Sequence, residues 1–407
     1  MIASRWLHRG VVASRWGRAA VLALAASAVW ADAAGAIPAF ARRYKMSCVT
    51  CHNVVPALSE FGEQFAGNGF RMVSGEEPTD TVGTGDDALV LLQNLPLAVR
   101  LDAYMQTYAG NRAVTDFQTP YSLKLLSSGA ISRKISWYFY AFLLERGEVG
   151  GVEDAFLVYD DVGGAPVDVA VGQFQISDPL FKRELRLEFE DYAVYRARLG
   201  DALADLTYDR GVMVTADALG FALTGIVVNG NGRGAATDER RYDVDAGKNA
   251  MLRVSRDLGA GIRLGGFGLY GDAEAENLVD NETTMLGADG TFVTGPVEVN
   301  LQYVHREDDR PTFELADEGA ELDGGFAEVL VRPAGSRWYG FGLYNLVTAD
   351  RAILDVRLDT PGGARRYETL TGGVGYQLQR NLRVTGETTW DMEMERTRWT
   401  LGFVSAF

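Results

Sequence analysis

Residues 96–407 alternate apolar and polar side chains with a period of two. In the last segment Trp399, Leu401 and Phe403 share one face, whereas Arg398 and Thr400 lie on the other. This period is typical of β-strands, because successive side chains point to opposite faces. Alternation and turn residues together predict sixteen strands, at 96–109, 120–130, 135–145, 151–159, 166–176, 202–214, 218–229, 247–257, 260–271, 282–292, 294–305, 324–332, 336–348, 366–378, 381–391 and 396–407.

Charged and amide side chains collect on one face of these strands. For example, Val297, Val299 and Leu301 alternate with Glu298 and Asn300. A transmembrane barrel with a water-filled lumen has this pattern, with its apolar residues facing lipid. A soluble β-sandwich would place apolar residues on its inner face and would not gather Arg, Glu and Asp there. We therefore predict an all-β, porin-like transmembrane barrel of about sixteen strands, an even number as in bacterial single-chain barrels.

The connections between the predicted strands alternate between short and long. Tight turns such as 128–134 and 379–381 alternate with long connections at 177–201, 230–246, 306–323 and 349–365. With the N-terminus on the periplasmic side, every long loop would fall on the outer side of a bacterial outer membrane. The terminal Phe407 closes an aromatic-containing strand, which resembles the C-terminal signal of outer-membrane barrels.

The first 36 residues have the pattern of an export signal. A basic front end with four arginines precedes an apolar run at 19–30 and the small residues Ala34, Gly35 and Ala36. The run is about a dozen residues, too short for a helix to span a bilayer. An uncleaved anchor is the alternative reading of the same segment. We predict cleavage after residue 36.

The candidate chemistry follows directly, in the sequence Cys48-Val49-Thr50-Cys51-His52. The C-x-x-C-H pattern is typical of covalent attachment of haem c. The two thiols bind the two vinyl groups of one haem, and the adjacent histidine ligates the iron. A redox-active disulfide leaves the histidine unexplained, and a zinc site lacks a fourth ligand nearby. We predict one covalent haem c held by Cys48 and Cys51, with His52 as an axial ligand.

One short helix is expected after the motif. Pro56 fits its first turn, Leu58, Phe61 and Phe65 form an apolar stripe, and the pair Asn68-Gly69 ends it. Met72 is a candidate sixth ligand of the iron, although packing or an open iron is equally compatible with the sequence. The predicted organisation is thus a signal peptide at 1–36, a small α-helical c-type monohaem leader at 37–72, a linker at 73–95 and a barrel at 96–407.

Charge excludes some partners and suggests others. The chain has 55 acidic and 39 basic residues, for a net charge of −16. This balance argues against nucleic acid, whose phosphates are neutralised by Lys and Arg. Acidic residues concentrate in the predicted outer loops at 271–282, 306–323 and 391–395. Such loops attract cations to the mouth of a barrel, or bind divalent ions that bridge lipopolysaccharide.

The segment PAFARRYKMSCVTCH, from Pro38 to His52, resembles the leader of the fused monohaem cytochrome–porins, as do the residues Pro56, Leu58, Phe61-Gly62, Phe65 and Asn68-Gly69-Phe70 that follow. That family includes the outer-membrane ferrous-iron oxidases of iron-oxidising bacteria. The resemblance implies that extracellular Fe(II) is the electron donor and a periplasmic c-type cytochrome or other carrier is the acceptor. Residues 171–174 and 178–181 are also similar to a segment of the phosphate-selective porins O and P.

Three functions compete on this basis. The first is an outer-membrane electron conduit, which as an enzyme would be an Fe(II) oxidase of the iron:cytochrome c oxidoreductase type. The second is a passive porin in which the haem leader forms a plug. The third is a haem enzyme such as a peroxidase, which the sequence supports least because it offers no distal histidine: His305 is expected on the lipid face.

Overall fold

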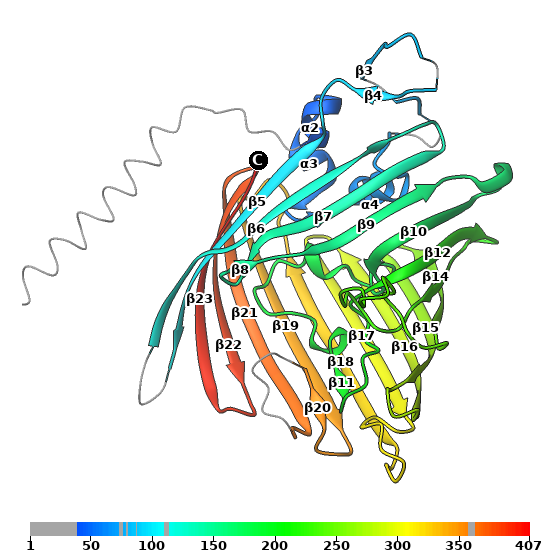
Figure 1. The fold of residues 1–407 in the computed structure, drawn as a ribbon. Helices are drawn as coiled ribbons and strands as arrows, with labels where there is room; N and C mark the ends of the chain where they lie inside the picture. Colours follow the sequence, from blue (N-terminus) through cyan, green and yellow to red (C-terminus); the bar gives the residue numbers. More distant parts are fainter. Residues whose placement is uncertain (1–38, 73–75, 79, 87, 110–113, 357–362) are drawn as a thin grey trace, which may run out of the picture. The chain divides into compact units, whose positions relative to one another are not determined.

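Sixteen long antiparallel strands among the described residues close into a barrel (Figure 1). The computed structural model describes residues 39–72, 76–78, 80–86, 88–109, 114–356 and 363–407. The predicted export signal at 1–36 lies outside them. The strands are β5 (Leu97–Tyr108), β6 (Val114–Ala130), β7 (Ile135–Glu145), β9 (Val152–Tyr159), β10 (Val167–Gln175), β12 (Tyr208–Ala218), β13 (Phe221–Val228), β14 (Asn249–Gly259), β15 (Ile262–Glu274), β16 (Asp280–Thr294), β17 (Val297–Asp308), β18 (Ala320–Val331), β19 (Trp338–Ala349), β21 (Arg366–Gln379), β22 (Leu382–Asp391) and β23 (Arg396–Ala406).

The last strand closes the barrel against the first. Strand β23 pairs with β5 in a register that sets Arg398 opposite Tyr108 and Leu401 opposite Met105. Closure gives every strand a partner on both sides, so no edge is left with unpaired backbone groups. A two-residue strand, β8 (Glu148–Val149), extends the hairpin after β7. The predicted sixteen-stranded, all-β barrel is confirmed.

Burial alternates along the strands as the sequence pattern requires. On β17, Asn300 and Gln302 are buried in the lumen, whereas Leu301 and Tyr303 are exposed on the outer face. His305 continues this outer face, where its ring contacts the carboxylates of Asp323 and Glu307 at 3.0 Å each. The outward position predicted for His305 is thus correct. Among the described residues, no helix is long and apolar enough to cross a membrane.

The two ends of the barrel differ in their connections. Tight turns join the strands at one end, which we call the turn end, at 131–134, 160–166, 219–220, 260–261, 295–296, 332–337 and 380–381. The long connections, such as 176–207, 229–248 and 309–319, join them at the opposite end, the loop end, together with short ones such as 275–279 and 392–395. Strand β5 begins and β23 finishes at the turn end, so the barrel starts and stops on the same side. The predicted alternation of short and long connections is thus confirmed for the long loops, but not at 275–279 and 392–395.

One long connection folds into the lumen. Residues 176–207, here called the inward segment, link β10 to β12 and contain η2 (Arg183–Leu185), η3 (Ala193–Tyr195) and β11 (Arg198–Leu199). Strand β11 pairs with β20 (Leu354–Asp355) of a second long connection. The prediction that every long loop lies outside is wrong for 177–201, because Tyr195 and Leu199 are fully buried inside the barrel. It is also wrong for part of 349–365, where Leu354 is buried in the same internal core. The strand predicted at 202–214 accordingly begins later, at Tyr208.

An apolar core fills part of the lumen. The inward segment contributes Leu180, Phe181 and Leu206, which pack against inward-facing apolar side chains of strands β13 to β21. The wall residues of this core are Ile226, Val228, Met251, Phe267, Leu269, Met285, Val304, Ala320, Leu322, Phe326, Leu343, Val347 and Tyr367. The expectation of a uniformly wet lumen is therefore corrected: one part of the interior is packed like a soluble protein core.

The leader is built from short elements. They are α2 (Ala39–Tyr44), α3 (Cys48–Cys51), β1 (His52–Val54), β2 (Ala57–Leu58) and α4 (Glu60–Gly67). Helix α4 begins after Ser59, whose hydroxyl accepts a hydrogen bond from the Gly62 amide at 3.2 Å. The predicted helix start at Pro56 is wrong, because Pro56 lies in the turn between β1 and β2. In the predicted linker, β3 (Thr81–Val82) and β4 (Leu91–Leu92) form a small hairpin.

Candidate functional site

The two cysteines lie one helical turn apart. Cys48 is the first residue of α3 and Cys51 the last, and both thiols are free and partly buried. Burial raises the pKa of each thiol. The chain then enters β1 at His52, so the histidine follows the second thiol without a gap. Two thiols on one turn beside a histidine form the donor set that a c-type haem requires.

The Nδ1 nitrogen of the His52 ring has a hydrogen-bond partner. This nitrogen lies 3.0 Å from the carbonyl oxygen of Pro56. Because a carbonyl oxygen only accepts hydrogen bonds, Nδ1 must donate, and in a neutral ring Nε2 keeps its lone pair. Burial lowers the pKa of His52, which favours that neutral ring. A metal-ligating histidine in proteins is oriented by such a bond from its other nitrogen.

The thiol-bearing turn packs closely on helix α4. A Cβ atom at Gly62 would lie 2.1 Å from the Cys51 carbonyl oxygen, so only glycine permits this approach. Three residues further along α4, Phe65 is buried in a cluster with Phe40, Tyr44 and Phe70. The leader thus combines the donor set with an apolar aromatic cluster. These residues fit a haem c.

The leader packs against the turn end of the barrel. Val54 and Ala57, from the β1–β2 hairpin, contact Leu187 of the inward segment and the barrel residues Leu330, Tyr339 and Phe341. Phe70 stacks on Tyr138 of β7, with ring centroids 4.9 Å apart.

A buried arginine strengthens this attachment. Arg71 is fully buried, forms an ion pair with Asp160 and donates a hydrogen bond to the Arg133 carbonyl. Asp160 and Arg133 both belong to tight turns of the barrel. The leader is therefore held by apolar, aromatic and ionic contacts.

Met72 and Met105 lie in different surroundings, one in the leader and one in the barrel wall. Met72 follows the buried Arg71, but its own side chain is 43% exposed and its amide donates to Glu76 at 2.8 Å. Met105 lies on the outer face of β5, opposite Leu401, and is therefore directed away from the lumen. The role of Met72 as sixth ligand stays a prediction. No group of three or more His, Cys, Asp or Glu side chains arranged to hold a metal ion is found among the described residues.

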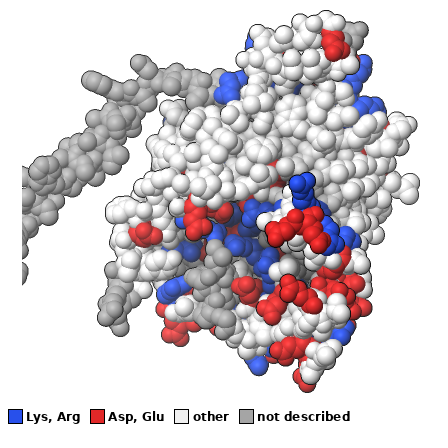
Figure 2. All heavy atoms as spheres, viewed as in Figure 1, with Lys and Arg blue, Asp and Glu red and all other residues white. Residues whose placement is uncertain are grey.

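A polar cavity of about 1100 Å³ occupies another part of the lumen. It is lined by strands β5 to β7, the inward segment and the second long connection near β20. Figure 2 shows Lys and Arg side chains inside the hollow and acidic side chains around it. The basic residues in its lining are Arg100, Lys124, Arg146, Arg183, Arg186, Arg196, Arg198 and Arg233. Four of these arginines belong to the inward segment, so placing that segment outside the barrel left them unrecognised.

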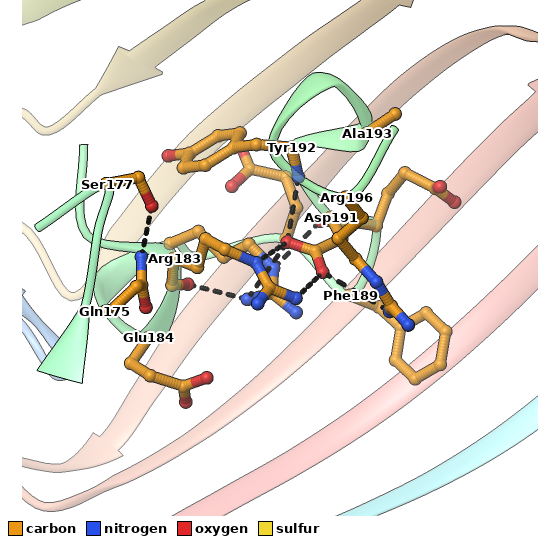
Figure 3. A network of polar contacts seen from close by, with 12 residues as sticks. Gln175, Ser177, Arg183, Glu184, Phe189, Asp191, Tyr192, Ala193 and Arg196 are labelled. Carbon is orange, nitrogen blue, oxygen red and sulfur yellow. Dashed lines mark hydrogen bonds and ion pairs between the residues drawn. The ribbon is translucent and has the colours of Figure 1, made fainter. Parts of the chain in front are cut away.

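Asp191 organises the inward segment (Figure 3). Its carboxylate accepts a hydrogen bond from Arg183 Nε at 3.0 Å and another from the Tyr192 amide at 2.9 Å. Nitrogen atoms of Arg186 and Arg196 lie 3.6 and 3.8 Å from its oxygens. Burial would raise the pKa of Asp191, but Arg183 and Arg186 outweigh burial and hold the pKa well below its ordinary value.

Hydrogen bonds to the barrel wall fix the segment. Tyr192 donates to Glu328 at 2.6 Å and Tyr195 to Gln302 at 2.9 Å. The Phe189 amide donates to Glu387 at 2.7 Å. These partners lie on three different strands, so the segment is a fixed partition between the cavity and the leader. Its residue Leu187 touches the leader, whereas Arg186 and Glu188 line the cavity.

Comparison with known proteins identifies the fold. No protein-family model and no curated protein sequence matches the chain. Among solved structures, the anion-selective porin from Comamonas acidovorans has a TM-score of 0.55 at 10% identity, over 77% of this chain and 99% of the porin. The outer membrane channel DcaP of Acinetobacter baumannii has a TM-score of 0.54 at 10% identity, over 77% of this chain and 97% of the channel. In-vitro folded OmpT of Vibrio cholerae has a TM-score of 0.53 at 12% identity, over 77% of this chain and 99% of OmpT. The chain has the fold of bacterial outer-membrane porins, which supports a location in the outer membrane.

Proposed function

We propose that this chain is an outer-membrane electron-transfer protein with one haem c, attached to Cys48 and Cys51 and ligated by His52, at the turn end of a porin-type barrel. The observation that carries the proposal is the His52 hairpin. Its ring donates Nδ1–H to Pro56, and the same hairpin packs on the inward segment through Val54 and Ala57. When bound, haem c supplies a one-electron redox centre.

The two ends of the barrel would meet different partners, the electron acceptor at one end and the electron donor at the other. The turn end would face the periplasm, where a c-type cytochrome or another carrier accepts electrons. The loop end would face the outside, where Fe(II) is the expected donor on the family resemblance. The inward segment separates the two, with Arg186 and Glu188 on the cavity side and Leu187 on the leader side. A donor in the cavity is thus kept from the leader by a single layer of protein. The proposed sixth ligand of the haem iron is Met72.

Covalent attachment is the direct test of this proposal. The full chain, with its export signal, is expressed in a bacterium that matures c-type cytochromes, and denatured protein is stained for haem on a gel. We expect staining of the wild type and loss of staining in a double variant with Cys48→Ser and Cys51→Ser. Thr50→Ala is the matched control, because the exposed Thr50 is a variable position of the motif. A folded barrel without covalent haem would contradict the proposal.

A passive porin with a haem-bearing plug is the second candidate. The porin fold and the cavity of about 1100 Å³ favour it. Planar-bilayer recordings separate the two functions. The conduit function predicts small currents, because the apolar core and the leader occupy much of the path. Sustained conductance typical of an open diffusion channel would favour the passive porin.

A further inference from the structure

A buried arginine lies beneath the hairpin that bears His52. Arg383 is the second residue of β22, at the turn end, and its side chain is buried in the lumen with only 4% exposed. Its Nη1 donates a hydrogen bond to the Tyr339 hydroxyl at 3.2 Å. Tyr339 packs in one apolar cluster with Val54 and Ala57 of the His52 hairpin. One tyrosine side chain therefore connects the guanidinium to the hairpin that positions His52.

The charge of Arg383 has no direct counter-charge. Its guanidinium forms no ion pair with any carboxylate among the described residues, and its Nε has no hydrogen-bond partner there. The nearest acidic residue on the same face of β22, Glu387, lies 3.6 Å from Arg398 instead. Arginine side chains stay ionised in proteins, so a buried positive charge is fixed at this position.

Two other acidic groups come near Arg383, and neither cancels its charge. Asp102 is influenced by Arg383, but it forms an ion pair with Arg100 at 2.8 Å. Glu188 acts on Tyr339 from the inward segment. Burial raises the pKa of Glu188 well above its ordinary value, which keeps this carboxyl group protonated and neutral. The lumen beneath the leader thus retains the positive charge of Arg383.

We propose that the buried charge of Arg383 raises the reduction potential of the haem that His52 ligates. This inference rests on the proposed function, because it requires the haem. Reduction adds one electron to the iron and lowers its charge by one unit, so a fixed positive charge nearby favours the reduced state. A buried charge is also screened less by salt than an exposed one. The barrel wall would thereby adjust how readily the leader accepts an electron.

Potentiometric titration of the purified full chain with its haem tests this proposal. Arg383→Gln removes the charge. At a fixed applied potential, we expect the ratio of reduced to oxidised haem to fall about threefold to tenfold, where tenfold corresponds to about 59 mV for a one-electron couple. Arg337→Gln is the matched control, because it removes an exposed positive charge from a turn at the same end of the barrel. It should leave the potential nearly unchanged.

Two further variants separate the charge of Arg383 from its role in packing. Arg383→Lys keeps a positive charge and should titrate close to the wild type. Tyr339→Phe removes the hydrogen bond at 3.2 Å but leaves the charge, and should also stay close to the wild type. Arg383→Met is a second neutral variant, expected to behave like Arg383→Gln. Removing a buried charge that has no counter-charge should not unfold the barrel, which heat-modifiable gel mobility verifies.

The outcomes distinguish this inference from the proposed function. A folded chain without covalent haem on a stained gel contradicts the proposed function, and the role of Arg383 with it. If the chain carries haem, but both folded neutral variants have the midpoint potential of the wild type, only the role of Arg383 is overturned. An equal decrease in Arg383→Lys and Arg383→Gln overturns it as well, because the shape of the side chain and not its charge would then control the potential.

Discussion

Gly62 controls how closely helix α4 approaches the cysteines. Because a Cβ atom there would overlap the Cys51 carbonyl oxygen, Gly62→Ala must push α4 away from the thiol-bearing turn. We expect this variant to lose most of its covalent haem while the barrel still folds. Gly67→Ala, in the same helix, has nothing within 4 Å of the added carbon and is the control. Haem staining normalised to folded barrel measures the effect; equal staining of the two variants would contradict this account.

Glu188 makes stability depend on pH. It is buried, and burial together with the neighbouring Glu328 raises its pKa well above the ordinary 4.5. Between these two pKa values the folded protein holds a proton that the unfolded chain releases, so stability decreases as the pH rises. Glu188→Gln should raise the temperature of the heat-induced gel shift at neutral pH by a few degrees, and flatten the decline of this temperature as the pH rises above the ordinary pKa of 4.5.

The exposed Glu148→Gln exchange, in the β7–β8 hairpin, is the control for this prediction. It removes one carboxylate from the same protein without changing a buried site. If Glu188→Gln has the same pH profile as the wild type, Glu188 is ionised in the folded protein. The prediction that Glu188 holds a proton there is then refuted.

Single residues of the leader could be predicted only where spacing implies chemistry. The haem-binding roles of Cys48, Cys51 and His52 stay predictions, based on a motif that gives two thiols and a histidine in the order that haem c requires. Pro56 was misplaced, because a proline suits both the first turn of a helix and a tight turn, and the apolar spacing of Leu58, Phe61 and Phe65 extended the helix too far. The carbonyl oxygen of Pro56, which accepts a hydrogen bond from His52 Nδ1, has no signature in the sequence.

At the level of whole elements, Arg71 forms the main polar contact between the leader and the barrel. Removing its side chain leaves the Asp160 carboxylate buried without a counter-charge, which costs about 3–5 kcal/mol when a buried pair loses one member. We expect Arg71→Ala to release the leader to protease while the barrel stays folded. Arg133→Ala removes only an exposed pair with Glu77 and should have little effect.

A double variant tests the cause of this release. If the unpaired carboxylate is responsible, Arg71→Ala with Asp160→Ala should be cleaved more slowly than Arg71→Ala alone. Equal cleavage of wild type and Arg71→Ala would show that the apolar contacts of Val54, Ala57 and Phe70 hold the leader without the ion pair.

The barrel strands could be placed from the sequence to within a few residues, except at 202–214 and the start of β6. Their period-two pattern reports the boundary between lipid and lumen, and it persists along each strand. The inward segment escaped prediction because a long connection carries no period that reveals which way it folds. Its apolar residues, such as Leu180, Phe181 and Tyr195, were the available signal, since an outer loop has little reason to carry them.

The whole molecule combines a porin-type barrel with two internal obstructions. The leader packs at the turn end through the hairpin that bears His52, and the inward segment divides the lumen into an apolar core and a polar cavity. A general diffusion channel gains nothing from a donor set for haem held against this partition. The proposed electron transfer requires a short distance between donor and acceptor, which a single layer of protein around Leu187 would provide.

Rapid mixing of the purified full chain with Fe(II), under anaerobic conditions at neutral pH, tests electron transfer most directly. The absorbance band of reduced haem reports the reaction, and dithionite gives the full amplitude. We predict fast reduction whose rate saturates with Fe(II) concentration, as expected when the donor first binds. Protein that dithionite reduces normally but that stays oxidised with Fe(II) would contradict Fe(II) as the electron donor.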